Sequence, residues 1–528
     1  MLRLSTVSAS LDCGNSIDAA AASYSATTVN CSWAGHLPDG MTEHAVIATK
    51  GSSIATMRRL DGVQSDDRRG MAEKGYASAR ELSPFDIACV VIGGIVGIGI
   101  FFTPGTVARR VDSAFEMMLA WGIGGVLAAL GALVFADLAA RVPGHGGVFR
   151  YLQAAFGRTP AFLFGWANWL VIQSGALTVV ALLMVEHWER AFFGAPAFSP
   201  GTRVALAAAS ILVFTATNLL SLRVGKRVQN ALIVVKVAAI LALVASAATV
   251  VAVEAPAVAP ESAGGTMLSR LAAAMLPVLF AVGGWQQGSF IAGAAKRPAR
   301  DVPIGILSGV AVVIAVYIAI NLAYLSLLSF DGARSTSAIG ADAAQAALGD
   351  FGQSAFAAMV AVSAMGIMNT ICMAPPYVLL AMAQEGMFPR AFGKTHGPTG
   401  TPVVGVLAQG LWASFLLVLV HVVTVMTAPD GADESKRTLS VLDFVCDSVV
   451  FVDWLVYGMC GLALLKLRHR ADASPSRLPG AGVAAALFSI GAGLVALGAV
   501  AQKPWPSLLG ALLVTLGLLA RRWLLPHR

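Results

Sequence analysis

The chain has 528 residues, of which 57% are hydrophobic and only 12% are charged, and its mean hydropathy is +0.75. This composition excludes a water-soluble globular protein and is typical of a polytopic membrane protein, because charged side chains are costly inside a bilayer. The formal net charge of +7 is read as a sign of topology, and no nucleic-acid partner is expected, since most Lys and Arg residues lie between the apolar segments.

The first part of the chain contains no apolar segment of membrane length. Residues 1–80 are rich in Ala, Ser, Gly, Asp and Arg, without hydrophobic periodicity or the apolar core of a signal peptide. We predict that they form a disordered cytoplasmic tail. Met71 begins a short polar segment that leads directly into the first apolar span, which makes Met71 a candidate start of translation.

The rest of the chain alternates between apolar intervals and charged connections. Intervals of about 20 residues without charge mark membrane-spanning helices. Two further spans are equally apolar, although one contains Lys236 and the other contains three aspartates. The sequence therefore predicts twelve transmembrane helices, named spans 1 to 12: 87–108, 117–136, 159–185, 204–222, 228–253, 271–295, 302–330, 351–384, 395–429, 438–465, 478–502 and 504–520.

Charge and cysteine distribution indicate the orientation. The two tails and the connections after the even-numbered spans hold 26 of the 36 Lys and Arg residues, so we expect both termini in the cytoplasm and the chain in the plasma (inner) membrane. None of the 6 cysteines lies in a connection expected outside, and an accessory subunit linked by a disulfide is therefore not expected. No His, Cys, Asp and Glu cluster has metal-binding or catalytic spacing, so we expect no metal, no cofactor and no enzyme activity.

Span 1 contains an unusual run of glycines between Gly93 and Gly105. Glycine weakens a helix by about 1 kcal/mol relative to alanine, so the run predicts a break at membrane depth. A break exposes backbone N–H and C=O groups, which the bilayer tolerates only where they face protein, water or a ligand. The segment therefore predicts a binding site.

Span 6 carries a second break at Gly283-Gly284. Each break begins a block of five spans, and because five is odd, the second block must cross the membrane in the opposite sense. We predict an inverted repeat of residues 81–270 (helices 1–5) and 271–470 (helices 6–10), followed by helices 11 and 12 in 471–528. Glycines also let membrane helices pack closely, but interrupted segments at corresponding positions of two halves favour the central site of a transporter.

Four motifs then occur in a fixed order. They are Gly97 to Phe101 followed by Pro104; Asp137-Leu138-Ala139 followed by Pro143 to Gly147; Gly283-Gly284-Trp285 followed by Lys296 to Pro303; and Ser363, Gly366 and Asn369 followed by Ala381 to Gly386. Through these motifs residues 85–525 resemble an amino-acid permease of the amino acid/polyamine/organocation (APC) superfamily, closest to its L-type amino acid transporter-like members. The resemblance implies an all-α fold of twelve transmembrane helices with broken helices 1 and 6. It also implies alternating access, in which spans 1, 2, 6 and 7 move against spans 3, 4, 8 and 9.

The two breaks offer the two poles that an amino acid needs. A free amino acid carries a carboxylate and an ammonium on one carbon, and the N–H groups of a half-helix attract the first while free carbonyls attract the second. We expect the carboxylate at residues 97–99 and the ammonium at the carbonyls of Ile95, Phe280 and Ala281. The resemblance makes Phe280 an aromatic gate, with lipid or core packing as the alternative. The predicted substrate-binding residues are Ile95, Gly97, Ile98, Gly99, Phe280, Ala281 and Gly283.

Lys236 is the second candidate site. It lies nine residues beyond Arg227, about 13 Å into the bilayer at about 1.5 Å per residue, where an ionisable group is a functional candidate. The resemblance implies that a lysine here fills the place of sodium in sodium-coupled relatives and bridges spans 1 and 8, with Ser363 as a partner. A structural lysine satisfied by carbonyls is the alternative. We therefore expect sodium-independent transport, by proton coupling or by exchange.

The aspartates of span 10 do not identify the chemical class of the substrate. Asp453 either pairs with a lysine or lines the cavity, and the role of Asp447 is not assigned. Binding of a polycation would favour carboxylates in spans 1, 3, 6 and 8, which contain none, so a neutral amino acid is preferred. The alternatives are a polyamine or organic cation transporter of the same fold, and a nutrient sensor that does not transport.

Overall fold

The computed structural model describes residues 80–195, 197–249, 263–336, 338–396, 399–427, 434–469 and 478–524, without the side chains of 434–450 and 523–524. The chain divides into two units, Met1–Lys74 and Gly75–Arg528, and all described residues belong to the second. The predictions for Met71 and for the tail before residue 80 therefore lie outside the described residues, as does Asp447 apart from its place in a helix.

The described secondary structure is helical apart from one isolated bridge between Leu82 and Ala295. The elements are α3 (Pro84–Ile95), α4 (Gly99–Ala108), α5 (Ala114–Arg141), α6 (Val148–Phe156), α7 (Arg158–Ala167), η4 (Asn168–Gln173), α8 (Ser174–Phe193), α9 (Pro200–Leu220), α10 (Leu222–Ala247), α11 (Met267–Val282), α12 (Gln287–Phe290), η5 (Ala292–Ala294), α13 (Pro298–Ser335), α14 (Ile339–Leu348), α15 (Asp350–Met373), α16 (Pro376–Gln384), η6 (Arg390–Gly393), α17 (Val403–Met426), α18 (Glu434–Arg468), α19 (Ala481–Gln502) and α20 (Pro504–Leu524).

The bounds of the helices agree closely with those of most predicted spans. Among the described residues, 10 helical segments are long and apolar enough to cross a membrane, and α3 with α4, bent by 47° at their junction, makes an eleventh. The remaining predicted span, 438–465, falls within α18, whose first side chains are not described. The predicted fold class, an all-α polytopic membrane protein, is confirmed.

Three spans differ locally from the prediction. Span 3 is interrupted by the π-helix η4, and span 8 is interrupted at Ala374-Pro375, where α15 ends and α16 begins with a second proline. Proline lacks the N–H that would continue a helix. The prediction that span 9 begins at residue 395 was wrong, because α17 begins only at Val403, directly after Pro402.

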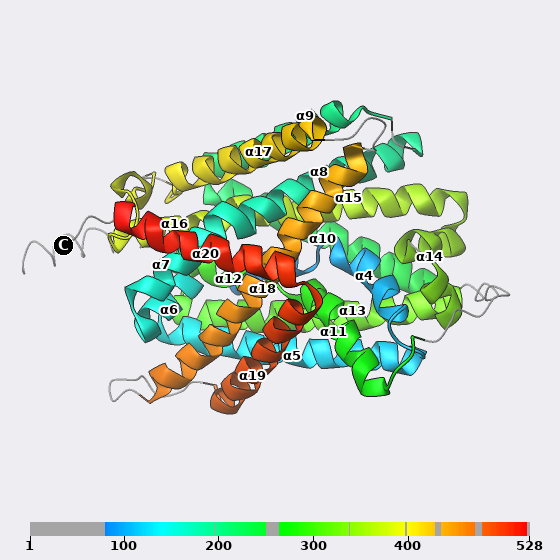
Figure 1. Ribbon diagram of the computed structural model, residues 1–528, viewed down its shortest axis with the longest axis horizontal. Coiled ribbons are helices and arrows are strands. Elements are labelled where there is room, and N and C mark those ends of the chain that lie inside the picture. The colour runs from blue at the N-terminus through cyan, green and yellow to red at the C-terminus, as the bar shows by residue number, and fades with distance from the viewer. Residues whose placement is uncertain are drawn as a thin grey trace, which may run out of the picture. The chain divides into compact units, whose positions relative to one another are not determined.

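Helices at corresponding positions of the two predicted halves pack against each other. α5 contacts α13, α8 contacts α15 and α9 contacts α17, which are spans 2 and 7, 3 and 8, and 4 and 9. Figure 1 shows α9 and α17 side by side along the upper edge. A two-fold relation between the halves would bring such partners together. The division into two repeats itself stays a prediction.

An aromatic cluster anchors the segment that follows the break in span 6. Trp285 is fully buried, and its ring lies 5.5 Å from Tyr457, 6.0 Å from Phe488, 6.2 Å from Trp454 and 6.3 Å from Phe135, measured between ring centroids. These rings come from α5, α18 and α19. Burial of an aromatic side chain among several helices fixes its backbone firmly, so the cluster holds the broken part of span 6 in place.

Candidate substrate-binding site

Both glycine breaks open onto a single cavity of about 470 Å³ between spans 1, 3, 6, 8 and 10. This volume is in the range of small-molecule sites. Its lining includes all the residues predicted to bind the substrate: Ile95, Gly97, Ile98, Gly99, Phe280, Ala281 and Gly283. Among the described residues, no group of three His, Cys, Asp or Glu side chains is placed to hold a metal ion.

The break in span 1 lies between Ile95 and Gly99, and its amides differ in availability. The N–H of Gly97 donates to the carbonyl of Ile95 at 2.8 Å, so the prediction that this group is free for a carboxylate was wrong; the chain turns too tightly there. The N–H groups of Ile98 and Gly99 have no hydrogen-bond partner among the described residues, and Ile98 supplies no side-chain cap. Ile98 and Gly99 therefore provide the free N–H groups at the positive, N-terminal end of α4.

The break in span 6 touches the break in span 1 through its backbone. α11 ends at Val282, and Gly284 has a φ of +131°. A Cβ atom at Gly284 would lie 2.3 Å from the carbonyl oxygen of Gly94. Only glycine permits both this conformation and this close approach, so the two unwound segments meet at a point that a side chain would separate.

The negative side of the cavity lies at the end of α11. The last carbonyls of a helix have no intrahelical partner, and Phe280 and Ala281 belong to this turn. The side chain of Phe280 lines the cavity and is 51% exposed, as a mobile aromatic cover would be.

Tyr317 of α13 is a residue of this region that the sequence did not reveal. Its buried hydroxyl lies 3.0 Å from the carbonyl oxygens of both Ile95 and Ala281. A hydroxyl has one proton, so it donates to one of these carbonyls at a time. Tyr317 thus links the two broken spans, and a tyrosine within an apolar span carries no sequence signal of such a role.

Lys236 lies beside the break, where the resemblance placed it. The side chain is fully buried, and its Nζ donates to the carbonyl of Val96 at 2.5 Å. The hydroxyl of Ser363 in α15 lies 3.4 Å from the same oxygen and 3.3 Å from that of Gly97, and it donates to one of them at a time. A Cβ at Gly366 would lie 3.2 Å from the ammonium, so this glycine leaves room for it. Lys236 therefore connects span 5 to the break in span 1, with span 8 on the other side.

The far wall of the cavity is formed partly by α18. Asp453 lines the cavity, which settles the alternative left open by the sequence. The hydroxyl of Tyr457 contacts the Asp453 carboxylate, and the amide of Gln286 contacts Tyr457 in turn. The remaining walls are mostly apolar and include Phe102, Val179, Val180, Leu183, Ile367 and Ile371.

At the end predicted to be cytoplasmic, ion pairs join span 1 to span 5. Glu81 and Arg223 are 2.5 Å apart, and Asp86 and Lys226 are 3.0 Å apart. The N–H groups of Glu81 and Leu82 also donate to the carbonyl of Ala294, at 2.9 and 3.0 Å. The segment before span 1 therefore covers the end of span 6 that contains Ala294.

Asp137, at the same end of span 2, is fully buried and pairs with two arginines. It lies 3.1 Å from Arg141 and 3.5 Å from Arg468 of α18. Arg150 lies 3.8 Å from Glu385. The fold thus brings Arg468 of α18 to Asp137 from 331 residues away.

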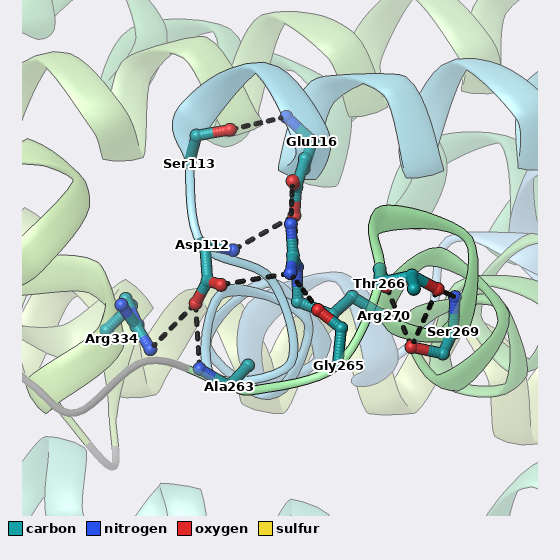
Figure 2. A network of polar contacts seen from close by, with 9 residues as sticks. All are labelled: Asp112, Ser113, Glu116, Ala263, Gly265, Thr266, Ser269, Arg270 and Arg334. Carbon is teal, nitrogen blue, oxygen red and sulfur yellow. Dashed lines mark hydrogen bonds and ion pairs between the residues drawn. The ribbon is translucent and has the colours of Figure 1, made fainter.

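At the opposite end, Arg270 is the centre of a network shown in Figure 2. Its guanidinium lies 2.5 Å from Glu116 and 3.2 Å from Asp112, and Arg334 lies 3.7 Å from Asp112. These residues belong to the start of α11, the start of α5 with the turn before it, and the end of α13. The network therefore ties spans 2, 6 and 7 together at this end.

Comparison with known proteins agrees with this geometry. The chain is 26% identical over 426 residues to the b(0,+)-type amino acid transporter 1 of Oryctolagus cuniculus, covering 79% of the chain and 81% of that protein. It is 26% identical over 389 residues to the serine/threonine exchanger SteT of Bacillus subtilis (72% and 82% covered) and 29% identical over 378 residues to the methylthioribose transporter of the same species (67% and 79%). These relatives are transporters, as expected for a chain that is not an enzyme. The amino acid permease family matches residues 82–518, and the chain belongs to that family of the APC superfamily.

Proposed function

We propose that the protein exchanges zwitterionic amino acids across the plasma (inner) membrane by alternating access, without sodium. The observation that carries the proposal is the single cavity with a free helix N-terminus at Ile98 and Gly99 on one side and the carbonyls of Phe280 and Ala281 on the other. Only a molecule with both an anionic and a cationic group uses both poles. One relative is named as an exchanger, the serine/threonine exchanger SteT, which supports exchange.

Lys236 supports the independence from sodium. Its ammonium already occupies the carbonyl of Val96 at the break, and Ser363 reaches the same oxygen. Carbonyl and hydroxyl oxygens are the ligands that a hard cation would use, so the ammonium fills a place suited to a metal ion. Among the described residues, no carboxylate pairs with this ammonium.

The ion pairs suggest how access alternates. At the predicted cytoplasmic end they cross from spans 1 and 2 to spans 5 and 10, through Glu81, Asp86 and Asp137. At the other end the Arg270 network stays within spans 2, 6 and 7 (Figure 2). We therefore propose that these spans move as one body with span 1, and that opening toward the cytoplasm separates the crossing pairs. The partly exposed pair of Glu81 and Arg223 adds little stability. The buried Asp137 keeps Arg141 of its own helix when it separates from Arg468.

The features of the same cavity argue against the two alternatives, a polyamine transporter and a nutrient sensor. A polyamine would leave the N–H groups of Ile98 and Gly99 without a carboxylate, and a sensor without turnover would not need ion pairs that cross between moving parts. The preference for a neutral side chain rested on spans 1, 3, 6 and 8, whereas Asp453 comes from span 10. We therefore keep the amino acid and treat its side chain separately below.

Topology and partners complete the proposal. The distribution of Lys and Arg supports cytoplasmic termini, and the cysteines described as free, Cys89, Cys372 and Cys460, are buried, which supports a carrier without a disulfide-linked subunit. Alkaline phosphatase fused after residue 528 should be inactive, because that enzyme requires export. Active phosphatase would place the terminus outside and contradict the topology.

The test of function is uptake into proteoliposomes that contain the purified full-length chain. Vesicles loaded with an unlabelled mixture of amino acids should accumulate labelled amino acid from outside, equally well in sodium and in choline buffer. Empty vesicles should accumulate little. A steep dependence on external sodium would refute the sodium independence, uptake driven by a proton gradient into empty vesicles would replace exchange with proton coupling, and no uptake in any mode would refute transport.

A further inference from the structure

One wall of the cavity offers hydrogen-bond acceptors in excess of donors. Asp453 contributes a carboxylate, and Gln286 and Gln287 each contribute a side-chain carbonyl. Both glutamines are 95% buried, since each is only 5% exposed. Their Oε1 atoms have no hydrogen-bond partner among the described residues. A buried acceptor without a donor is costly, so this wall is built for a partner that is not part of the protein.

The neighbouring hydrogen bonds fix which atoms stay free. The Nε2 of Gln287 donates to the Oε1 of Gln173 at 2.9 Å, and the Nε2 of Gln173 donates to Asn168 at 3.2 Å. This series of hydrogen bonds orients the amide of Gln287 so that its oxygen remains available.

A second series of hydrogen bonds orients the other two acceptors, Gln286 and Asp453. The amide of Gln286 contacts the Tyr457 hydroxyl, and that hydroxyl contacts Asp453. Since a carboxylate can only accept, Tyr457 donates its single proton to Asp453 and accepts from the Nε2 of Gln286. The oxygen of Gln286 is thus left without a partner among the described residues, and the remaining lone pairs of Asp453, which lines the cavity, stay available.

Among the residues that the structure describes, no cationic side chain lines this wall. The residues that line the cavity include Asp453 but no lysine, arginine or histidine. Asp453 is half-buried, and a carboxylate that is partly withdrawn from water is stable when a cation and further hydrogen bonds satisfy it. The missing counterion must therefore come from what enters the cavity.

We propose that Asp453, Gln286 and Gln287 form a subsite for the cationic side chain of the transported amino acid, an amine or a guanidine. The inference rests on the proposed function, because the α-carboxylate and α-ammonium occupy the poles at the two breaks. The side chain then spans the cavity toward α18, where its ammonium or guanidinium donates to the three oxygens. A guanidinium, with five N–H donors, satisfies this wall most fully.

Three probes of similar length separate the groups involved. L-Lysine carries all three charges, L-norleucine lacks the side-chain amine, and cadaverine lacks the α-carboxylate. Each competes with labelled L-arginine in the exchange assay with the full-length protein. We expect lysine to compete at concentrations about 10- to 100-fold lower than norleucine or cadaverine, the usual contribution of hydrogen bonds to a charged group.

Variants assign the effect to the carboxylate. Asp453→Asn keeps the size of the side chain and removes its charge, so the ratio between the competition by lysine and that by norleucine should fall at least about tenfold. Tyr457→Phe, which removes only the hydroxyl beside Asp453, should produce a smaller loss. Asp350→Asn, at an exposed position at the start of α15, is the matched control and should behave as the wild type.

The outcomes distinguish failure of the proposed subsite from failure of the proposed exchange function. If labelled leucine is exchanged but lysine has no advantage over norleucine, the subsite is refuted and the amino-acid exchanger stands. If Asp453→Asn elutes as a monodisperse protein but loses norleucine exchange as well, or leaves lysine preferred, the subsite is also refuted. Cadaverine equal to lysine would overturn the carboxylate pole, and no exchange of any amino acid would overturn the function itself.

Discussion

Replacement of Gly284 by alanine tests the contact between the two breaks. The residue has a φ of +131°, which costs a residue with a side chain about 1–3 kcal/mol. The new Cβ would lie 2.3 Å from the Gly94 oxygen and 2.9 Å from the amide nitrogen of Ile95, whereas ordinary contacts begin at 3.4 Å. Both obstacles are backbone atoms, so they move only if the broken spans separate by about 1 Å, which costs a further 1–3 kcal/mol or so.

Together these costs reach about 2–6 kcal/mol, a large part of the stability of an ordinary protein. We expect Gly284→Ala to lower the thermal midpoint of the detergent-solubilised protein, followed by fluorescence-detected size exclusion. Exchange in proteoliposomes should fall more than about tenfold, because displacement of the poles by about 1 Å disrupts both charged contacts to the substrate.

The neighbouring glycine provides the control. Gly283 has a φ of −71°, and a Cβ there would meet nothing closer than the Leu279 oxygen at 3.6 Å. Gly283→Ala should therefore keep the thermal midpoint. Wild-type stability and exchange in Gly284→Ala would show that the two backbones do not touch in the working protein.

Three further substitutions test other contacts. Lys236→Met removes the ammonium at Val96 and with it the cost of a buried charge, so exchange should fall more than about tenfold without a loss of thermal stability; undiminished exchange would contradict the role. Tyr317→Phe should raise the KM about fivefold, which corresponds to about 1 kcal/mol. Tyr324→Phe on the same helix removes a buried hydroxyl that has no partner among the described residues and should raise stability; equal effects of the two substitutions would argue against the bridge. Arg270→Gln should slow exchange and lower the thermal midpoint, and the exposed Arg190→Gln should do neither; if both behave alike, the network in Figure 2 does not hold the spans together.

The parts of the site that could be predicted are those that conflict with their surroundings. Glycines weaken a helix and a lysine resists an apolar environment, so Gly97, Gly284 and Lys236 stand out in a hydrophobic sequence without knowledge of the fold. The breaks in α3–α4 and α11–α12 lie where the glycines predicted them. The prediction that the N–H of Gly97 is free for a carboxylate was wrong. A single pair of φ and ψ angles decides whether an amide points toward a ligand or, as here, toward a carbonyl of its own chain.

The rest depends on which segments meet. Tyr317 is an ordinary residue of span 7 until the fold brings two carbonyls to its hydroxyl. Asp453 could have faced any neighbour of α18, and only the packing of that helix turns it toward the cavity. The same holds for Arg223, whose partner Glu81 lies 142 residues away in the chain. Local pattern fixes the breaks, whereas long-range packing fixes what surrounds them.

The single proton of Tyr317 has a consequence for the energetics of loading the carrier. When the hydroxyl donates to Ile95, which also accepts from Gly97, the carbonyl of Ala281 is an acceptor held in place yet unoccupied. In the proposed binding mode, an incoming ammonium takes that oxygen without displacing any hydrogen bond of the protein. Occupation of the cavity then adds interactions and removes none, so the site needs little rearrangement before it binds.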